Sequence, residues 1–319
     1  MKFRNYLQLL FGISTYFPFI YNLRSKSKGS GGTFSSRYCI AVWFRHLISI
    51  FGKTNKKKFN YIAEIGPGDS IGVGILALLL GAKKYYAFDV VKFADIDKNL
   101  IIFREIVRFL KNRENIPNEK EFPKVNPMLN DYDFPSYIYS DEYLEHSLRD
   151  ENLEKIEYSI LNQNRDDSLI VYENEWDTFN SKVKENSLDL IFSQATMEHI
   201  DEVERSYETM NLYLRKGGLI SHSIDFRSHG YASTWDGHWL YSDLYWKLLR
   251  GRRPYLINRL PLSKHIKFMK LNNFEILDNQ IIKNLSNIKN KNKNKNFFSD
   301  FDENDFTSSV TYLLGSKKN

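Results

Sequence analysis

The feature that most constrains the fold is a glycine-rich turn, residues 66–72, with an apolar run on either side. Residues 61–65 precede the turn, and the helix-like run 73–80 follows it. A second apolar run, 85–88, ends in an acid, Asp89. This order of strand, glycine turn, helix, strand and acid is typical of an open α/β sheet that binds a nucleoside at the carboxyl ends of its strands.

The side chains around the turn indicate which nucleoside ligand fits. Gly66 and Gly68 permit backbone angles closed to other residues and let the main chain approach a ligand. The turn lacks the lysine and hydroxyl of a GxxxxGK[ST] phosphate loop, and it carries Glu64 and Asp69 instead. Two carboxylates would repel a pyrophosphate but suit an ammonium group. S-adenosylmethionine (SAM), an ammonium and sulfonium compound without phosphate, is such a ligand; an ordinary strand–helix turn is the alternative.

Composition and charge set the broad class. The 319 residues, 42% of them hydrophobic, can bury one large core, and the single cysteine, Cys39, excludes a disulfide framework and a cysteine-based zinc site. We expect Cys39 to be a buried side chain in a cytoplasmic protein. Residues 1–58 contain eleven of the 45 Lys and Arg and no Asp or Glu. They are therefore predicted to be a basic, aromatic N-terminal segment, separate from a catalytic domain at 59–319.

The basic segment suggests an anionic partner, such as a membrane face, a lipid-linked substrate or nucleic acid. A solvated segment packed on its own domain is an equal alternative. The apolar run 5–22 is short and interrupted by Pro18, so an interfacial or docked helix is expected rather than a spanning one. Residues 1–28 are thus candidates for peripheral contact with the inner membrane face.

Apolar periodicity predicts the remaining elements of an α/β fold with a seven-stranded sheet. Further strands are expected at 168–172, 188–193, 219–224, 274–282 and 309–314, and helices at 99–113, 141–162, 201–214 and 263–271. Gly217-Gly218 is expected to end the 201–214 helix. Inserts are predicted at 92–166 and 226–262, and the Lys/Asn-rich stretch 284–300 is expected to be a mobile loop.

Four motifs in this order resemble class I SAM-dependent methyltransferases. Residues 64–68 resemble the family's first motif and Asp89 its ribose-binding acid. Residues 187–200 resemble the fourth motif, with an "LEHV"-like helix start, and 214–218 the "LkpGG" signature. Shorter blocks resemble an uncharacterised, type 11-like bacterial group; they are 31–38, 193–199, 221–226, 237–239 and 257–259. The resemblance implies a Rossmann-like methyltransferase sheet with helical insertions, and SAM as cofactor.

The resemblance also implies the cofactor contacts. Glu64 would orient the methionine amine, and Asp89 would accept both ribose hydroxyls, with a helix N-cap as its alternative role. Ser193 and Gln194 would lie near the reacting methyl group, or form a buried polar pair. Trp176 and Asp177 could flank the adenine, although the long insert after the second strand departs from the minimal fold. The predicted SAM site comprises Glu64, Gly66, Gly68, Asp69, Ser70, Asp89, Ser193 and Gln194.

A hydroxyl acceptor gains from a base that titrates near neutral pH, a role that suits histidine. His229 and His222 are the candidate bases, with Asp225 as the orienting carboxylate. His199 could simply start a helix, and His222 could pack into the core. The four histidines between 199 and 238 could ligate a metal, but no HxH or HExxH spacing occurs, so no metal is predicted.

The acceptor is expected to meet an aromatic, cationic wall. Aromatic faces stack on sugars, and arginines pair with phosphates. The wall comprises Trp235, Trp239, Tyr241, Trp246 and Arg252-Arg253, and the substrate-binding candidates are His199, His238, Trp239 and Arg259. A packed lid is the alternative. The predicted function is methyl transfer to an oxygen of a glycan or small molecule, as in polysaccharide biosynthesis. The alternatives are an RNA or protein methyltransferase, without a strong nucleic-acid signal, and a non-catalytic scaffold at a membrane.

Overall fold

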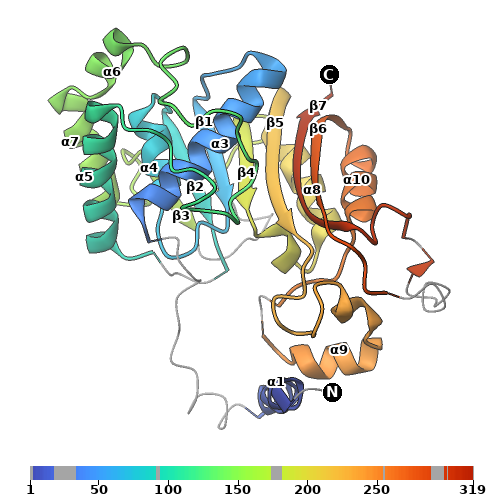
Figure 1. Ribbon diagram of the computed structural model, residues 1–319. Helices are drawn as coiled ribbons and strands as arrows, with labels where there is room; N and C mark the ends of the chain where they lie inside the picture. Colours follow the sequence, from blue (N-terminus) through green and yellow to red (C-terminus); the bar gives the residue numbers. More distant parts are fainter. Residues whose placement is uncertain are drawn as a thin grey trace.

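The fold is organised around one sheet. The computed structural model describes residues 3–17, 34–90, 94–173, 182–253, 256–288, 298–299 and 301–318. These residues form a seven-stranded sheet of order β3-β2-β1-β4-β5-β7-β6 (Figure 1). The strands are β1 (Tyr61–Ile65), β2 (Lys84–Phe88), β3 (Ile170–Glu173), β4 (Leu188–Gln194), β5 (Leu214–Asp225), β6 (Phe274–Lys283) and β7 (Ser308–Lys317). β1 to β5 pair in parallel, whereas β7 is antiparallel to β5 and β6. The predicted α/β class and seven-stranded sheet are confirmed.

Helices cover both faces of this sheet, as buried parallel strands require. They are α1 (Phe3–Ser14), α3 (Ser36–Thr54), α4 (Gly72–Leu79), α5 (Ile96–Asn112), α6 (Asp141–Ser147), α7 (Asp150–Leu161), α8 (Val203–Tyr213), α9 (Asp243–Arg250) and α10 (Leu262–Leu271), with the 3-10 turns η1 (Met197–His199) and η2 (Gly237–Leu240). One core joins the sheet to α3, α4 and α5, and a second joins it to α8 and α10. Phe192 belongs to the first core and Ile191 to the second. This alternation places Ser193 under α8 and α10, and Gln194 under α3.

Two local predictions are corrected by the structure. The helix predicted at 141–162 is two helices, because the chain breaks between α6 and α7 at Leu148 and Arg149. Gly217-Gly218 lies inside β5 rather than at a helix end, since α8 ends at Tyr213 and β5 begins at the next residue. Gly217 has a φ of 66°, and pairing shifts register between Leu188 and Leu190 of β4. The glycines therefore permit an irregularity at the start of β5.

The predicted boundary at residue 58 is wrong, because α3 belongs to the domain core. Its Trp43 and Phe44 are at most 3% exposed and lie in the same core as Ile62 of β1. A parallel sheet needs this face covered, and α3 covers it. Several basic residues of the segment also bind within the domain: Lys56 donates to the carbonyl of Gly217 at 2.6 Å. The excess of positive charge is therefore partly structural.

Arg45 of α3 fastens the proline-punctuated stretch of the first insert to the core. Its side chain is fully buried. The guanidinium donates to the carbonyl oxygens of Pro117 at 2.9 Å, Phe122 at 3.3 Å and Val125 at 2.5 Å, and it stacks on the Tyr132 ring. A planar group with five donors suits three diverging carbonyls. The irregular insert thus has its buried backbone acceptors satisfied by a side chain.

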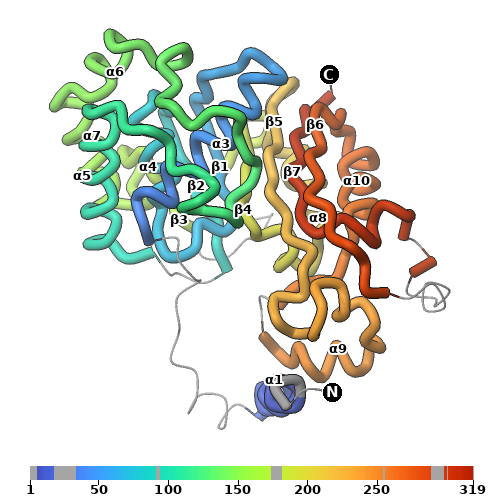
Figure 2. Tube along the Cα trace, in the orientation of Figure 1, coloured from blue at the N-terminus to red at the C-terminus, as the bar shows by residue number. Residues whose placement is uncertain are grey.

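A second lobe follows β5 and includes the N-terminal helix. Figure 2 shows α1 alongside α9, although more than two hundred residues separate them in the sequence. A Cβ on Gly12 would lie 2.2 Å from the carbonyl oxygen of Leu249, so only glycine allows this approach. The amide of Arg252 donates to Thr15 Oγ1 at 2.7 Å. The apolar run at the N-terminus therefore includes a docked helix, one of the two predicted outcomes.

Among the described residues, no helix combines the length and apolar character needed to cross a bilayer. Of the Lys/Asn-rich stretch, residues 289–297 and 300 lie outside the described residues, so its mobility stays a prediction.

We expect Arg45→Ala to lower the free energy of unfolding by about 3 kcal/mol or more, because it leaves the buried carbonyls of Pro117 and Val125 without the donor that they have in the structure. The control is Arg37→Ala, which removes an exposed pair between α3 and Glu121 and should cost less than about 1 kcal/mol. Urea unfolding followed by circular dichroism measures both. Equal, small losses for the two variants would contradict the role given to Arg45.

Candidate functional site

The glycine turn folds back onto the end of β2. Gly66 and Gly68 have φ angles of 73° and 72°, in the left-handed region that favours glycine. The amide of Gly66 donates to the carbonyl oxygen of Phe88 at 2.7 Å, and the amide of Gly68 donates to Asp89 Oδ2 at 3.1 Å. The turn and the acid that the sequence paired are therefore hydrogen-bonded neighbours at the carboxyl ends of two adjacent strands.

Asp89 braces this turn through both carboxylate oxygens. Its other oxygen, Oδ1, accepts the amide of Val90 at 2.8 Å, and the residue is 9% exposed. A carboxylate can accept several hydrogen bonds at once, which is the capacity that the two hydroxyls of a ribose require. The alternative role as a helix N-cap is wrong, because the cap of α5 is Asp95, whose side chain accepts from the amide of Lys98.

Glu64 lies beneath the turn rather than in solvent. The residue is 3% exposed, and its Oε2 accepts from the Tyr85 hydroxyl at 2.6 Å. Burial raises the pKa of Glu64 to about 8, opposed by the Tyr85 hydrogen bond and assisted by the charge of Asp89. A cation brought beside this carboxyl would favour its ionised form. The sequence missed Tyr85, because only the pairing of β1 with β2 brings the two side chains together.

Ser70 and Cys39 lie on the interior side of the turn. Ser70 is 2% exposed, its Oγ is 3.6 Å from Cys39 Sγ, and it accepts the amide of Gly72 at 3.4 Å. Its side chain therefore supports the start of α4, and its role as a ligand contact stays a prediction. Burial raises the pKa of Cys39 to about 12, as expected for an inert core thiol. Asp69 is 7% exposed, and its role stays a prediction.

The structure corrects the roles of Ser193 and His222. Ser193 Oγ and His222 Nδ1 are 2.8 Å apart on neighbouring strands, both side chains are fully buried, and the imidazole faces Tyr207 of α8. Burial lowers the pKa of His222 to about 3. The alternating faces of β4 and β5 place this pair in the core, so His222 cannot meet an acceptor as a base and Ser193 cannot meet the cofactor.

Gln194 lies on the opposite face and has a partner that the sequence did not suggest. Its Oε1 is 3.1 Å from His46 Nε2, and His46 Nδ1 is 2.7 Å from Ser221 Oγ. Burial lowers the pKa of His46 to about 4. Since His46 lies on α3 and precedes Gln194 by 148 residues, no local signal could have found it. Gln194 remains a candidate at the end of β4.

Three predicted substrate residues hold the second lobe together instead. Trp239 is 1% exposed and donates from Nε1 to the carbonyl of Arg259 at 3.0 Å. Arg259 donates to Asp243 Oδ1 at 2.6 Å and stacks on Trp246. His238 is 1% exposed, and burial lowers its pKa to about 3. These side chains are part of the lobe's interior and have partners within it, so their binding of substrate stays a prediction.

Most residues of the predicted aromatic wall pack against the N-terminal segment that contains α1. The guanidinium of Arg253 lies over the rings of Phe11 and Tyr231, and that of Arg252 lies over Tyr16. These cations are therefore engaged by the N-terminal helix. The alternative of a packed structure with its own internal partners fits better here than an open substrate wall.

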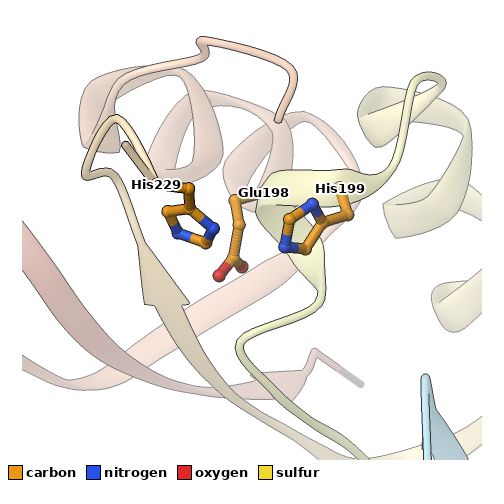
Figure 3. Close-up of side chains that lie close together, drawn as sticks. All are labelled: Glu198, His199 and His229. Carbon is orange, nitrogen blue, oxygen red and sulfur yellow. The ribbon is translucent and has the colours of Figure 1, made fainter. Parts of the chain in front are cut away.

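Polar groups instead gather where β4 and β5 end. The turn η1 carries Glu198 and His199, and His229 follows β5; one ligand atom from each lies within 4.8 Å of the others. Figure 3 shows the Glu198 carboxylate between the two imidazole rings. Thr196 connects this cluster to the glycine turn, since a Cβ on Gly66 would lie 2.4 Å from Thr196 Cγ2. The cluster is thus adjacent to the predicted cofactor loop.

Asp225 and His229 lie as the predicted acid–histidine pair requires. His229 Nε2 is 3.4 Å from Asp225 Oδ2, and the His229 side chain is 26% exposed. Burial alone would raise the pKa of Asp225, but hydrogen bonds from His229 and Arg227 outweigh it and hold that pKa below the usual range. Arg227 donates to Asp225 Oδ1 from both its amide and Nε. The arrangement can orient an imidazole toward an acceptor; catalysis by His229 stays a prediction.

Glu198 is an unexpected feature of this cluster. It is 3% exposed, and neither carboxylate oxygen has a hydrogen-bond partner among the described residues. Burial raises its pKa well above the usual range, the charge of Asp225 adds to this, and nearby backbone amides only partly offset it. The sequence singled out His199 of this turn but not Glu198. Trp176 and Asp177, predicted beside the adenine, lie outside the described residues.

Several solved structures that the chain matches are described as methyltransferases. An S-adenosylmethionine-dependent methyltransferase from Mesorhizobium loti is 13% identical, with 84% of this chain and 96% of that chain covered and a TM-score of 0.41. Phosphoethanolamine N-methyltransferase 2 from Haemonchus contortus, with S-adenosylhomocysteine bound, is 12% identical, with 87% and 53% covered and a TM-score of 0.40. The CurJ carbon methyltransferase is 11% identical, with 85% and 52% covered and a TM-score of 0.38.

No protein family model matches the chain, and the search of curated proteins finds no relative. The methyltransferase structures are therefore what the fold is similar to, and the narrower type 11-like resemblance has no family model behind it. Similarity this distant carries neither a cofactor nor an acceptor to this chain, so both are argued from its own residues.

The buried histidines make stability depend on pH. The pKa values of His46 and His222 fall to about 4 and about 3 on folding, from 6.5. Between these values the unfolded chain takes up protons that the folded chain does not, so stability is lost as the pH falls through about 6.5. We expect the free energy of unfolding to fall by about 2 kcal/mol per buried histidine between about pH 7.5 and pH 5.

Urea unfolding at the two pH values measures this loss. His46→Gln keeps a hydrogen-bonding side chain without a titrating group, so its loss should be smaller than that of the wild type. Parallel losses in both proteins would show that His46 does not contribute.

Proposed function

We propose that this chain is a methyltransferase that uses SAM as the methyl donor. The observation that carries the proposal is the junction of the glycine turn with Asp89, in which Gly68 donates to the carboxylate that would accept the ribose. The buried Glu64 adds a carboxyl that an α-ammonium group would favour in its ionised form. A nucleoside with a cationic, phosphate-free tail matches these groups better than a pyrophosphate does.

We further propose an oxygen acceptor on a glycan or another small molecule. Asp225 and His229 lie at the end of β5, beside the turn that contacts the glycine loop. A partly exposed imidazole held by a carboxylate is suited to take a proton from a hydroxyl. An RNA or protein acceptor draws its support from the basic N-terminal residues, and Arg45 and Lys56 among these are occupied within the domain.

SAM binding by the full chain tests the donor. We expect a micromolar dissociation constant, on the order of 7–8 kcal/mol, and a loss of at least about tenfold in Asp89→Ala, because the variant removes the ribose acceptors and the brace of the turn. Isothermal calorimetry with SAM and S-adenosylhomocysteine measures both.

Asp97→Ala is the matched control, since Asp97 is an exposed acid in the first turn of α5. It should bind as the wild type does. A folded wild-type protein that binds neither compound would overturn the proposal and favour the non-catalytic scaffold.

We propose in addition that the lobe of α1 and α9 contacts a membrane surface peripherally. Tyr6, Leu7 and Leu10 of α1 and Leu244 of α9 are each more than half exposed. A lobe that exposes large apolar side chains together with an N-terminal segment rich in Lys and Arg suits an anionic lipid surface. Such a location would bring a lipid-linked glycan within reach.

Co-sedimentation with vesicles containing anionic lipid tests this contact. We expect the wild type to bind and Leu7→Glu/Leu10→Glu to remain in the supernatant, because the new charges oppose both burial and the anionic surface. Leu161→Glu, at an exposed leucine at the end of α7, is the control and should bind normally. Equal binding by all three proteins would exclude α1 as the contact.

A further inference from the structure

We propose that Glu198, His199 and His229 form a binding site for a divalent transition-metal ion. Their three ligand atoms lie within 4.8 Å of one another. A tetrahedral ion with ligand bonds of about 2.0–2.2 Å holds its ligand atoms roughly 3.5 Å apart, so a movement of about 1 Å closes the set. Figure 3 shows the carboxylate between the imidazoles, as a shared ligand ion would require.

The state of Glu198 is a second, independent reason. Within the described part of the chain, this carboxylate is 3% exposed and has no hydrogen-bond partner on either oxygen, which is costly because the nearby backbone amides offset the loss of water only in part. A cation would supply the missing interaction, and it would meet the carboxylates of Glu198 and Asp225, of which Asp225 is already paired with Arg227. A proton on Glu198 is the competing solution.

The segments that carry the ligands are held in place. The side-chain amide of Asn258 donates to the carbonyls of Met197 and Ile200 at 2.9 and 2.8 Å. The backbone amide of Asn258 donates to the carbonyl of Glu198 at 2.7 Å. His229 has a φ of 47°, and a strained backbone of this kind occurs preferentially at functional sites. The carboxylate of Asp225 beside His229 resembles the outer groups that orient metal-bound imidazoles.

The donor set favours zinc and related ions. Two imidazole nitrogens and one carboxylate oxygen suit Zn²⁺, Co²⁺ or Fe²⁺, whereas Mg²⁺ and Ca²⁺ prefer oxygen ligands alone. Three protein ligands leave at least one coordination position open, which is the pattern of catalytic rather than structural zinc sites.

The role of the ion rests on the proposed methyltransferase function. With the ion bound, His229 would be a ligand and the ion would replace it in activating the acceptor: a hydroxyl bound at the open position would lose its proton more easily, and the proton would pass to solvent. The oxygen would then form a bond to the methyl carbon while the bond from that carbon to sulfur breaks, so that SAM leaves as neutral S-adenosylhomocysteine. The contact of Thr196 with the Gly66 position places the cluster beside the loop that would hold SAM.

Metal binding by the full chain tests the site directly. The protein is stripped with a chelator, separated from it, and titrated with Zn²⁺ by calorimetry in the absence of SAM. We expect one ion per chain in the wild type. Glu198→Gln and His229→Ala should each weaken binding by more than about 100-fold, since even groups behind the ligands commonly contribute 10- to 100-fold.

His146→Ala is the matched control, because it removes an exposed imidazole on α6, at the far end of the molecule in Figure 1. It should bind Zn²⁺ as the wild type does. Co²⁺ titration of the wild type adds a readout that does not depend on the variants: the expected visible absorption is that of cobalt with nitrogen and oxygen ligands. Wild-type protein without bound Zn²⁺ or Co²⁺, or affinities equal in all variants, would overturn the proposal.

SAM binding measured on the same chelator-treated protein separates this proposal from the previous one. Intact SAM binding with no metal binding would overturn the metal site and leave the methyltransferase function standing. Metal binding without SAM binding would support the site and remove its proposed role in methyl transfer.

Discussion

The burial of α3 against the parallel sheet is the interaction on which the rest of this structure depends. Parallel strands are buried on both faces and need a helical cover on each. α3 provides much of this cover on one face, and three polar side chains of the same helix reach different parts of the molecule. Cys39 contacts Ser70 under the glycine turn, Arg45 holds the carbonyls of the first insert, and His46 joins Gln194 to Ser221. One helix, buried on all sides from Cys39 to Leu47, therefore supports the loop, the insert and the strand ends together.

The alternation of side chains along β4 and β5 separates the polar residues at the strand ends into two groups. Ser193 and His222 lie in the core under α8 and α10, whereas Gln194 and Ser221 meet His46 on the opposite face. Neighbours in sequence thus have different environments, as a period of two requires. The groups available to a ligand come from just beyond the strands, where the sheet no longer dictates which way a side chain points.

The cluster of Glu198, His199 and His229 is built from two connections that each follow a strand. The carboxyl ends of adjacent parallel strands meet at one edge, so residues about thirty positions apart become neighbours. The contact of Thr196 with the glycine turn joins this cluster to the β1–β2 end of the same edge. The glycine turn, the pair of Asp225 and His229, and the buried carboxylate of Glu198 are therefore adjacent, although they come from three different stretches of the sequence.

The sequence by itself determined the sheet, its seven strands and the junction of Gly66, Gly68 and Asp89. These depend on local signals: apolar runs with strand or helix period, and glycines where the backbone takes positive φ angles. It also identified Asp225 with His229, because both follow one strand. It did not determine which polar side chains are buried. Trp239, Arg259 and His222 are residue types common in binding sites, but the structure places them in the interior.

Only the tertiary structure decided which polar side chains are buried. It also decided that α3 belongs to the domain and that the Glu198 carboxylate has no hydrogen-bond partner among the described residues. Burial depends on strand parity and on helices that arrive from distant parts of the chain, such as the one that carries His46. An unpartnered carboxylate is a property of all the surrounding groups at once. Short-range patterns in the sequence therefore cannot predict that the Glu198 carboxylate lacks a partner.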